Sequence, residues 1–155
     1  MSDETSDARV LEEALDDEYR AWATYEQVIR DFGPVLPFTR ILASEQRHID
    51  ALRSLFERYG LVVPENTWLG NVPRYASLRE ACEAAAAAEV ANGRMYDRLL
   101  GATATEEILR VLRNLRDASQ QRHLPAFQRC AERAADAAGA RHAMGRRHSR
   151  RTGRS

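Results

Sequence analysis

Five side chains in this sequence combine the chemistry of metal ligands with helical spacing. Glu45 and His48 are three residues apart, which places a carboxylate and an imidazole on one side of a helix, one turn from each other. Such a pair could hold one divalent ion, because mixed carboxylate and imidazole ligation suits iron, manganese or zinc. The other three candidates, each from a different part of the chain, are Glu18, Glu89 and His123.

Four stretches with helical periodicity carry these side chains, and the strong helix breakers of the sequence separate them. Asp7 could cap the first helix, and Ser77 with Glu80 three residues later forms a capping-box pattern at the start of the third. The predicted helices run from about Asp7 to Phe32, from about Pro37 to Tyr59, from about Ser77 to Leu100 and from about Thr105 to Ala138.

The inward face of each predicted helix is apolar except near its middle. In the second helix, Ile41 and Leu52 lie on the same face as Glu45 and His48. A carboxylate in a bundle core is costly unless it is paired or bound to metal, and polar residues interrupt the inward faces of all four helices. We therefore predict a metal site in the core, made by Glu18, Glu45, His48, Glu89 and His123.

The lengths of the connections predict how the helices are joined. Short connections make the first and second helices antiparallel, and likewise the third and fourth. Residues 61–76 lie between the two pairs. At ~3.3 Å per residue they could span a bundle of helices ~38 Å tall. The sequence therefore predicts an all-α, ferritin-like four-helix bundle of two antiparallel hairpins joined by a long crossover.

The sequence around the candidate ligands resembles ferritin-like proteins that hold a carboxylate-bridged di-iron site. The resemblance covers about residues 10–130, and it is closest to a prokaryotic ferritin-like family catalogued as a domain of unknown function. It implies a bundle related to rubrerythrin and bacterioferritin, with two iron ions at the five candidate ligands. The segments that carry it are Glu18-Tyr-Arg-Ala, Ala43-Ser-Glu-Gln-Arg-His48 and Ser119-Gln-Gln-Arg-His-Leu-Pro-Ala-Phe127.

Two departures from that pattern bear on function. A full di-iron site has a second Glu-x-x-His on the fourth helix, and Gln120 occupies that glutamate position here. The chain also lacks a CxxC-containing rubredoxin-like module, so electrons would come from a partner. Pro125, two residues beyond His123, should distort the helix beside this ligand.

Three functions remain open at this stage. The first is a di-iron oxidoreductase that acts on dioxygen or peroxide. The second is an iron-binding or sequestering protein without efficient turnover, which the glutamine at position 120 favours. The third is a bundle that acts through protein or DNA contacts, with no working metal site.

The charge of the chain is balanced overall but unevenly distributed. Net charge is zero, every basic residue is arginine, and residues 141–155 contain six arginines and no acid. We predict a bundle over residues 1–138 and a basic, disordered tail over residues 139–155. This tail could contact DNA phosphates or the acidic first 18 residues of another copy in a homo-oligomer.

The remaining features concern compartment and redox state. Residues 1–7 are acidic where a secretory signal would be basic and then apolar, and no run is long enough to span a membrane. These features predict a cytoplasmic protein without a membrane partner. Cys82 and Cys130 form no CxxC pair and fall on apolar helix faces, so we expect buried free thiols.

Overall fold

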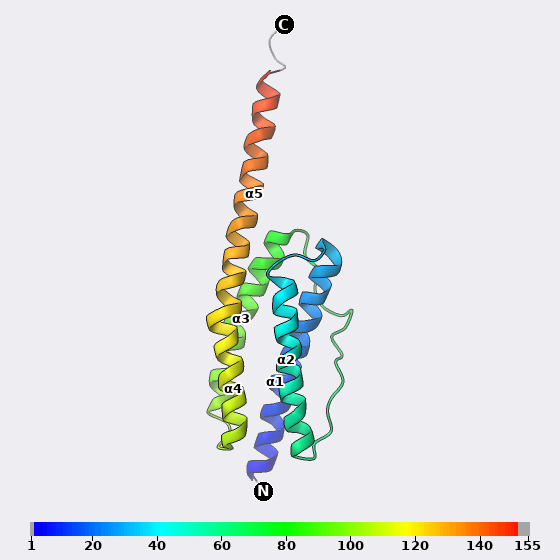
Figure 1. Ribbon diagram of the computed structural model, residues 1–155, viewed down its shortest axis with the longest axis vertical. Helices are drawn as coiled ribbons and strands as arrows, with labels where there is room; N and C mark the ends of the chain where they lie inside the picture. The colour runs from blue at the N-terminus through cyan, green and yellow to red at the C-terminus, as the bar shows by residue number, and fades with distance from the viewer. Residues whose placement is uncertain (1, 152–155) are drawn as a thin grey trace.

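The computed structural model describes residues 2–151 and the side chains of residues 4–146. The described chain is entirely helical, as predicted. Its elements are α1 (Ser2–Phe32), α2 (Phe38–Arg58), α3 (Leu78–Leu100), α4 (Glu106–Ala118), the π-helix η1 (Ser119–His123) and α5 (Leu124–Arg151). The last three follow one another without a break, and together they form the fourth column of a helical bundle (Figure 1).

Two helical hairpins make up the bundle. Helix α1 packs against α2, and α3 packs against α4 and α5. Gly33 and Gly60, with φ of 88° and 66°, lie just beyond the ends of α1 and α2, in a conformation that glycine adopts without strain. The segment 59–77 then runs along the outside of the bundle to the start of α3 (Figure 1). Tyr19 helps hold it there, because its hydroxyl donates a 2.8 Å hydrogen bond to the carbonyl of Pro64.

The core consists of two apolar clusters with polar residues between them. One cluster includes Leu11, Leu15, Leu52 and Leu112. The other is aromatic at its centre, where the rings of Tyr25, Phe38 and Phe127 pack together. Because the apolar side chains on both sides pack closely, the polar residues between them are held in fixed positions away from bulk water.

The starts of α3 and α1 differ in how well the sequence predicted them. The capping box at α3 is confirmed, since the amide of Glu80 donates a 3.1 Å hydrogen bond to Ser77 Oγ. The predicted cap at Asp7 was wrong, because α1 begins at Ser2. Asp7 instead accepts hydrogen bonds from the hydroxyls of Thr103 and Thr105, at 2.6 and 2.5 Å, and so ties α1 to the α3–α4 connection.

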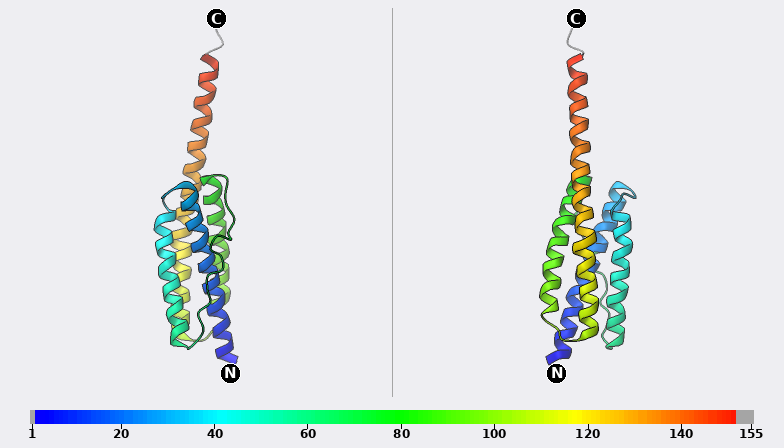
Figure 2. Two further views of the ribbon diagram at one scale, coloured as in Figure 1. Left: turned by 90° about the vertical axis from the view of Figure 1, so that its right-hand side faces the viewer. Right: turned by 60° about the vertical axis from the view of Figure 1, so that its left-hand side comes forward.

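The C-terminal segment also differs from the prediction. Helix α5 does not end before Gly139 but continues to Arg151, well beyond the bundle (Figure 2). Residues 139–151 of the expected tail are thus helical, residues 152–155 lie outside the described part, and the disorder of the tail stays a prediction. Side chains 137–146 are all exposed, because no other described helix reaches this part of α5. The division at residue 138, the DNA contact and the homo-oligomer stay predictions.

The prediction of free cysteine thiols was wrong. Cys82 on α3 and Cys130 on α5 are buried and joined by a disulfide, with their Cα atoms 5.8 Å apart. Both inward faces were recognised in the sequence, but the pairing depends on how α3 and α5 align. Among the described helices, none combines the length and apolar character that a membrane span requires.

Candidate metal centre

All five candidate ligands lie in one layer of the bundle core. Glu18 is on α1, Glu45 and His48 are on α2, Glu89 is on α3 and His123 ends η1. The three glutamates are no more than 3% exposed, and His123 is 4% exposed. Their potential ligand atoms form two groups, each within 4.8 Å: Glu18 with Glu45 and His48, and Glu45 with Glu89 and His123. Glu45 belongs to both groups.

The carboxylate of Glu45 lies between the two histidine rings. Its Oε2 atom is 3.0 Å from Nδ1 of His48, and its Oε1 atom is 3.1 Å from Nδ1 of His123. A second carboxylate completes each side. Oε2 of Glu18 is 3.5 Å from the His48 nitrogen, and Oε1 of Glu89 is 3.5 Å from the His123 nitrogen. The two oxygens of Glu45 thus face two separate groups of ligands.

Ser44, which the sequence analysis did not single out, orients both imidazoles. Its Oγ lies 3.1 Å from Nε2 of His123 and 3.4 Å from Nε2 of His48. The rings are stacked, with centroids 5.6 Å apart. Because Ser44 engages the Nε2 atoms, both Nδ1 atoms face the carboxylates, as metal-binding imidazoles do when a neighbouring group holds the other nitrogen.

Two buried tyrosines hold the outer glutamates. Tyr25 donates a 2.8 Å hydrogen bond to Oε1 of Glu89, and Tyr96 donates a short one to Oε1 of Glu18. Burial and the adjacent carboxylates raise the pKa of both phenols well above the usual value, so both remain donors. Both tyrosines belong to the apolar clusters of the core, and they are also hydrogen-bond partners of the site.

An internal sequence repeat underlies this symmetry. Ser44-Glu-Gln-Arg-His48 and Ser119-Gln-Gln-Arg-His123 differ only at their second residue. Glu18 and Glu89 each precede a tyrosine by seven residues. The repeat was visible in the sequence and could have identified Ser44 and the two tyrosines as residues of the site.

The second copy of the repeat differs in backbone as well as in sequence. Residues 119–123 form a π-helix, in which the amide of Leu124 bonds the carbonyl of Ser119. Ser119, the first residue of this π-helix, is buried and faces the site, and its Oγ donates a 2.5 Å hydrogen bond to Oε2 of Glu89. The sequence predicted a distortion here from Pro125, which cannot donate a backbone hydrogen bond.

Gln120 points away from the ligand groups. Its Nε2 donates to the backbone carbonyl of Glu89 at 2.7 Å and to Oγ of Ser119 at 2.8 Å. The side chain lies over Gly93, where an added Cβ would come within 2.4 Å of Gln120 Cδ. The glutamate position of the second repeat is therefore turned toward the α3 backbone, and three carboxylates remain in the centre.

The sequence profile of a family described as an uncharacterized protein domain, DUF2202, matches residues 7–142. The chain belongs to this family. No curated protein matches the sequence of this chain significantly. The crystal structure of a hypothetical protein from Methanococcus jannaschii DSM 2661 is similar to this chain, with a TM-score of 0.71 and 23% sequence identity. The similar region covers 81% of this chain and 79% of the other. That similarity shows a shared fold.

In this DUF2202 chain, protons held by Glu18, His48 and His123 offset the negative charge of the buried carboxylates. Burial and the adjacent Glu45 raise the pKa of Glu18 to about 8. Burial disfavours charging His48, but hydrogen bonds to Glu18 and Glu45 outweigh it and raise its pKa to about 10. Burial acts in the same way on His123, and Glu45 and Glu89 raise its pKa to about 9. A divalent ion could replace these protons.

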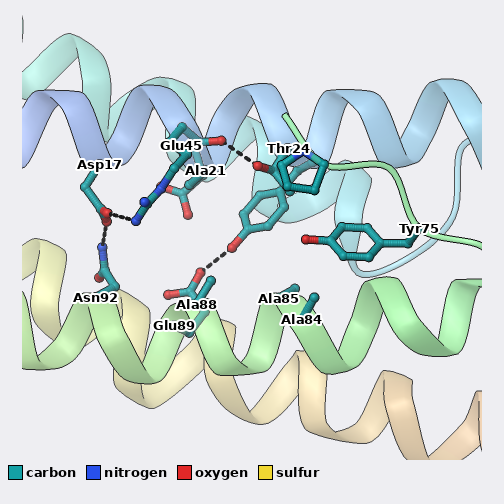
Figure 3. Close-up of a pocket in the computed structure, with 13 residues that line it drawn as sticks. Asp17, Ala21, Thr24, Glu45, Tyr75, Ala84, Ala85, Ala88, Glu89 and Asn92 are labelled. Atoms are coloured by element: carbon teal, nitrogen blue, oxygen red, sulfur yellow. Dashed lines mark hydrogen bonds and ion pairs between the residues drawn. The ribbon is translucent and has the colours of Figure 1, made fainter. Parts of the chain in front are cut away.

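A cavity of about 150 Å³ between α1 and α3 reaches the centre of the DUF2202 domain. Glu45 and Glu89 lie near one end of it and Tyr75 of the crossover near the other (Figure 3). At ~30 Å³ per water, a few small molecules would fill this volume. Small side chains make part of its wall, namely Ala21, Thr24, Ala84, Ala85 and Ala88.

Proposed function

We propose that this protein is a ferritin-like metalloprotein that binds two divalent ions, with iron as its physiological metal. One ion would bind to Glu18, Glu45 and His48. The other would bind to Glu45, Glu89 and His123. The observation that supports this proposal best is the position of Glu45, whose two oxygens lie 3.0 and 3.1 Å from different histidine nitrogens. One carboxylate could therefore bridge two ions.

The positions of the ligands along the chain support the ferritin-like assignment. Such proteins take one glutamate from each of two helices and a Glu-x-x-His pair from each of the other two. Here Glu18 and Glu89 supply the single glutamates, Glu45 with His48 supplies one complete pair, and His123 supplies half of the other. Mixed carboxylate and imidazole ligation suits iron, and also manganese or zinc.

We further propose that the reaction uses dioxygen or peroxide, with electrons from a partner protein. Iron would supply the redox chemistry. The protein would supply positioning, since Ser44 orients both histidines and Tyr25 and Tyr96 hold the outer carboxylates. The α1–α3 cavity is large enough to admit a small oxidant to Glu45 and Glu89.

A second candidate is iron binding without efficient turnover, and the orientation of Gln120 favours it. Because Gln120 bonds the α3 backbone, the centre contains three carboxylates for two ions with four positive charges. Surplus positive charge in a low-dielectric core weakens binding of the second ion unless a further anion joins it. The second ion would then exchange readily, and the protein would store or deliver iron.

The metal content of the aerobically purified protein tests these proposals. Wild-type protein is expected to contain two ions per chain, and Glu45→Gln is expected to lose both, because its carboxylate serves both groups. Glu18→Gln and Glu89→Gln should each lose one ion. Glu57→Gln, an exposed change on the same helix as Glu45, should match wild type.

Oxidation of added Fe(II) separates the two candidates. Catalytic oxidation by dioxygen or peroxide, abolished in Glu45→Gln, would establish the oxidoreductase. Stoichiometric binding without repeated oxidation would establish the iron-binding protein. Wild-type metal content in Glu45→Gln would show that the centre is not a metal site.

A further inference from the structure

A second and larger hollow lies on another face of the bundle. It has a volume of about 540 Å³ and lies between α2 and the column formed by η1 and α5. The cavity that reaches Glu45 and Glu89 lies between α1 and α3, so the two openings are separate. We call this hollow the arginine pocket because the residues that line it include Arg40, Arg47, Arg122, Arg129 and Arg133.

The arginine pocket concentrates charge of one sign. Within residues 4–146, no acidic side chain lines it. Among the side chains described, from residue 4 to residue 146, none of its five guanidinium groups forms an ion pair. Elsewhere on the bundle, Arg20, Arg74 and Arg98 are each paired with a carboxylate. A concave surface lined by one sign of charge focuses the electrostatic potential and raises the local concentration of counter-ions.

The type of cation indicates the type of ligand. Guanidinium groups are planar and present several donors at once, which matches the geometry of a phosphate group, and such charge-assisted pairs are stronger than neutral hydrogen bonds. Two opposing helical walls supply the five groups, so a bound anion would be approached from both sides. Arg40 and Arg47 come from α2, whereas Arg122, Arg129 and Arg133 come from η1 and α5.

The rest of the lining favours a small molecule over an extended polymer. Ile41, Pro125 and Ala126 add apolar surface beside the arginines, and Ser44 lies among the lining residues. The volume is within the range of ~300–1,000 Å³ that small-molecule sites occupy. An extended nucleic-acid backbone would instead use an exposed stripe, such as the part of α5 beyond the bundle.

We propose that the arginine pocket binds a phosphate group, either as inorganic phosphate or as part of a small phosphorylated molecule. This role goes beyond metal binding. The pocket adjoins the metal centre, because His123 and Ser44 also line it, but none of the five arginines is a candidate ligand. The phosphate would neutralise guanidinium groups of both walls, and the apolar side chains would contact an organic part of the ligand.

Titration calorimetry on the full-length, metal-free protein tests this proposal. The probes are inorganic phosphate, adenosine monophosphate and a short DNA duplex, at constant ionic strength. The pocket variant is Arg40→Gln with Arg129→Gln, one change in each wall. The control is Arg141→Gln with Arg146→Gln, which removes the same charge from exposed positions of α5 outside the pocket. Circular dichroism checks that both variants retain their helices.

Wild type and the control are expected to bind inorganic phosphate or adenosine monophosphate saturably, one per chain. The pocket variant should bind at least about tenfold more weakly, because two charge-assisted contacts are lost. Tighter binding of the nucleotide would indicate a phosphorylated molecule, and equal affinities would indicate free phosphate. Equal weakening in both variants, binding of the duplex alone, or no saturable binding would overturn the proposal. Since no metal is present and neither variant changes a candidate ligand, the result does not depend on metal binding.

Discussion

The hydroxyl of Tyr25 donates a 2.8 Å hydrogen bond to Glu89, which lies 64 residues later in the chain. Tyr96, on the helix of Glu89, makes the reciprocal contact with Glu18 on the helix of Tyr25. The two contacts cross between α1 and α3 and connect the two halves of the centre. Each outer carboxylate is thus oriented by the helix that carries the other one.

Tyr25→Phe should lower the free energy of unfolding of the metal-free protein by about 1–3 kcal/mol, because the buried carboxylate of Glu89 loses a donor. Metal affinity should fall more at the group of Glu45, Glu89 and His123 than at the group that contains Glu18 and His48. Chemical denaturation and metal titration would measure these effects. Tyr59→Phe is a suitable control, because Tyr59 also bonds a glutamate, Glu107, but is 40% exposed. Equal losses in both variants would contradict the prediction.

Gln120→Glu should destabilise the protein without adding a metal ligand. An ionised glutamate cannot donate the hydrogen bond that Gln120 gives to the carbonyl of Glu89, and it would place negative charge beside that oxygen. We expect a loss of about 1–3 kcal/mol with unchanged metal stoichiometry. Denaturation and metal analysis would test this.

Ser119→Asp is the matched change, because Ser119 Oγ already contacts the carboxylate of Glu89. An aspartate there should bind metal more tightly than wild type and destabilise the metal-free form, through repulsion between buried carboxylates. If Gln120→Glu tightened binding of the second ion and Ser119→Asp did not, the orientation of these two side chains on the π-helix would be wrong.

The raised pKa values predict opposite pH dependences for folding and for metal binding. The pKa values of His48 and His123 rise from 6.5 to about 10 and about 9 in the folded protein. Their contribution to folding stability is therefore complete below about pH 6.5 and is lost as pH rises through about 9 to 10. Glu18, with its pKa raised to about 8, acts in the same direction, because folding favours its neutral form.

Metal binding must displace these protons, so affinity should increase with pH over the same range. Near pH 7, loading both sites should release about three protons, two from the imidazoles and one from Glu18. Calorimetry in two buffers of different ionisation enthalpy would count them. Loading both sites with no proton release would contradict the described contacts among the carboxylates and imidazoles.

Helical periodicity was sufficient to place the candidate ligands on inward faces. Steps of three and four residues link Glu45 and His48 to the apolar residues of α2, and Ser119 and His123 to those of the fourth column. This inference needs only local geometry, because a helix fixes which residues share a face. The crossover was predictable for a similar reason, since its length can be compared with the height of the bundle.

Relationships between helices could not be obtained in this way. The sharing of Glu45, the Cys82–Cys130 disulfide and the arginine pocket all depend on distances across α2, α3 and α5. The orientation of Gln120 depends on a π-helix, which shifts the residues that face the core. The sequence by itself determined the helices, their inward faces and the residue types of the centre. Only the tertiary structure decided which carboxylate is shared between the two ligand groups and which residue of the second repeat faces the centre. Side chains from separate helices meet at angles and heights that local spacing does not specify.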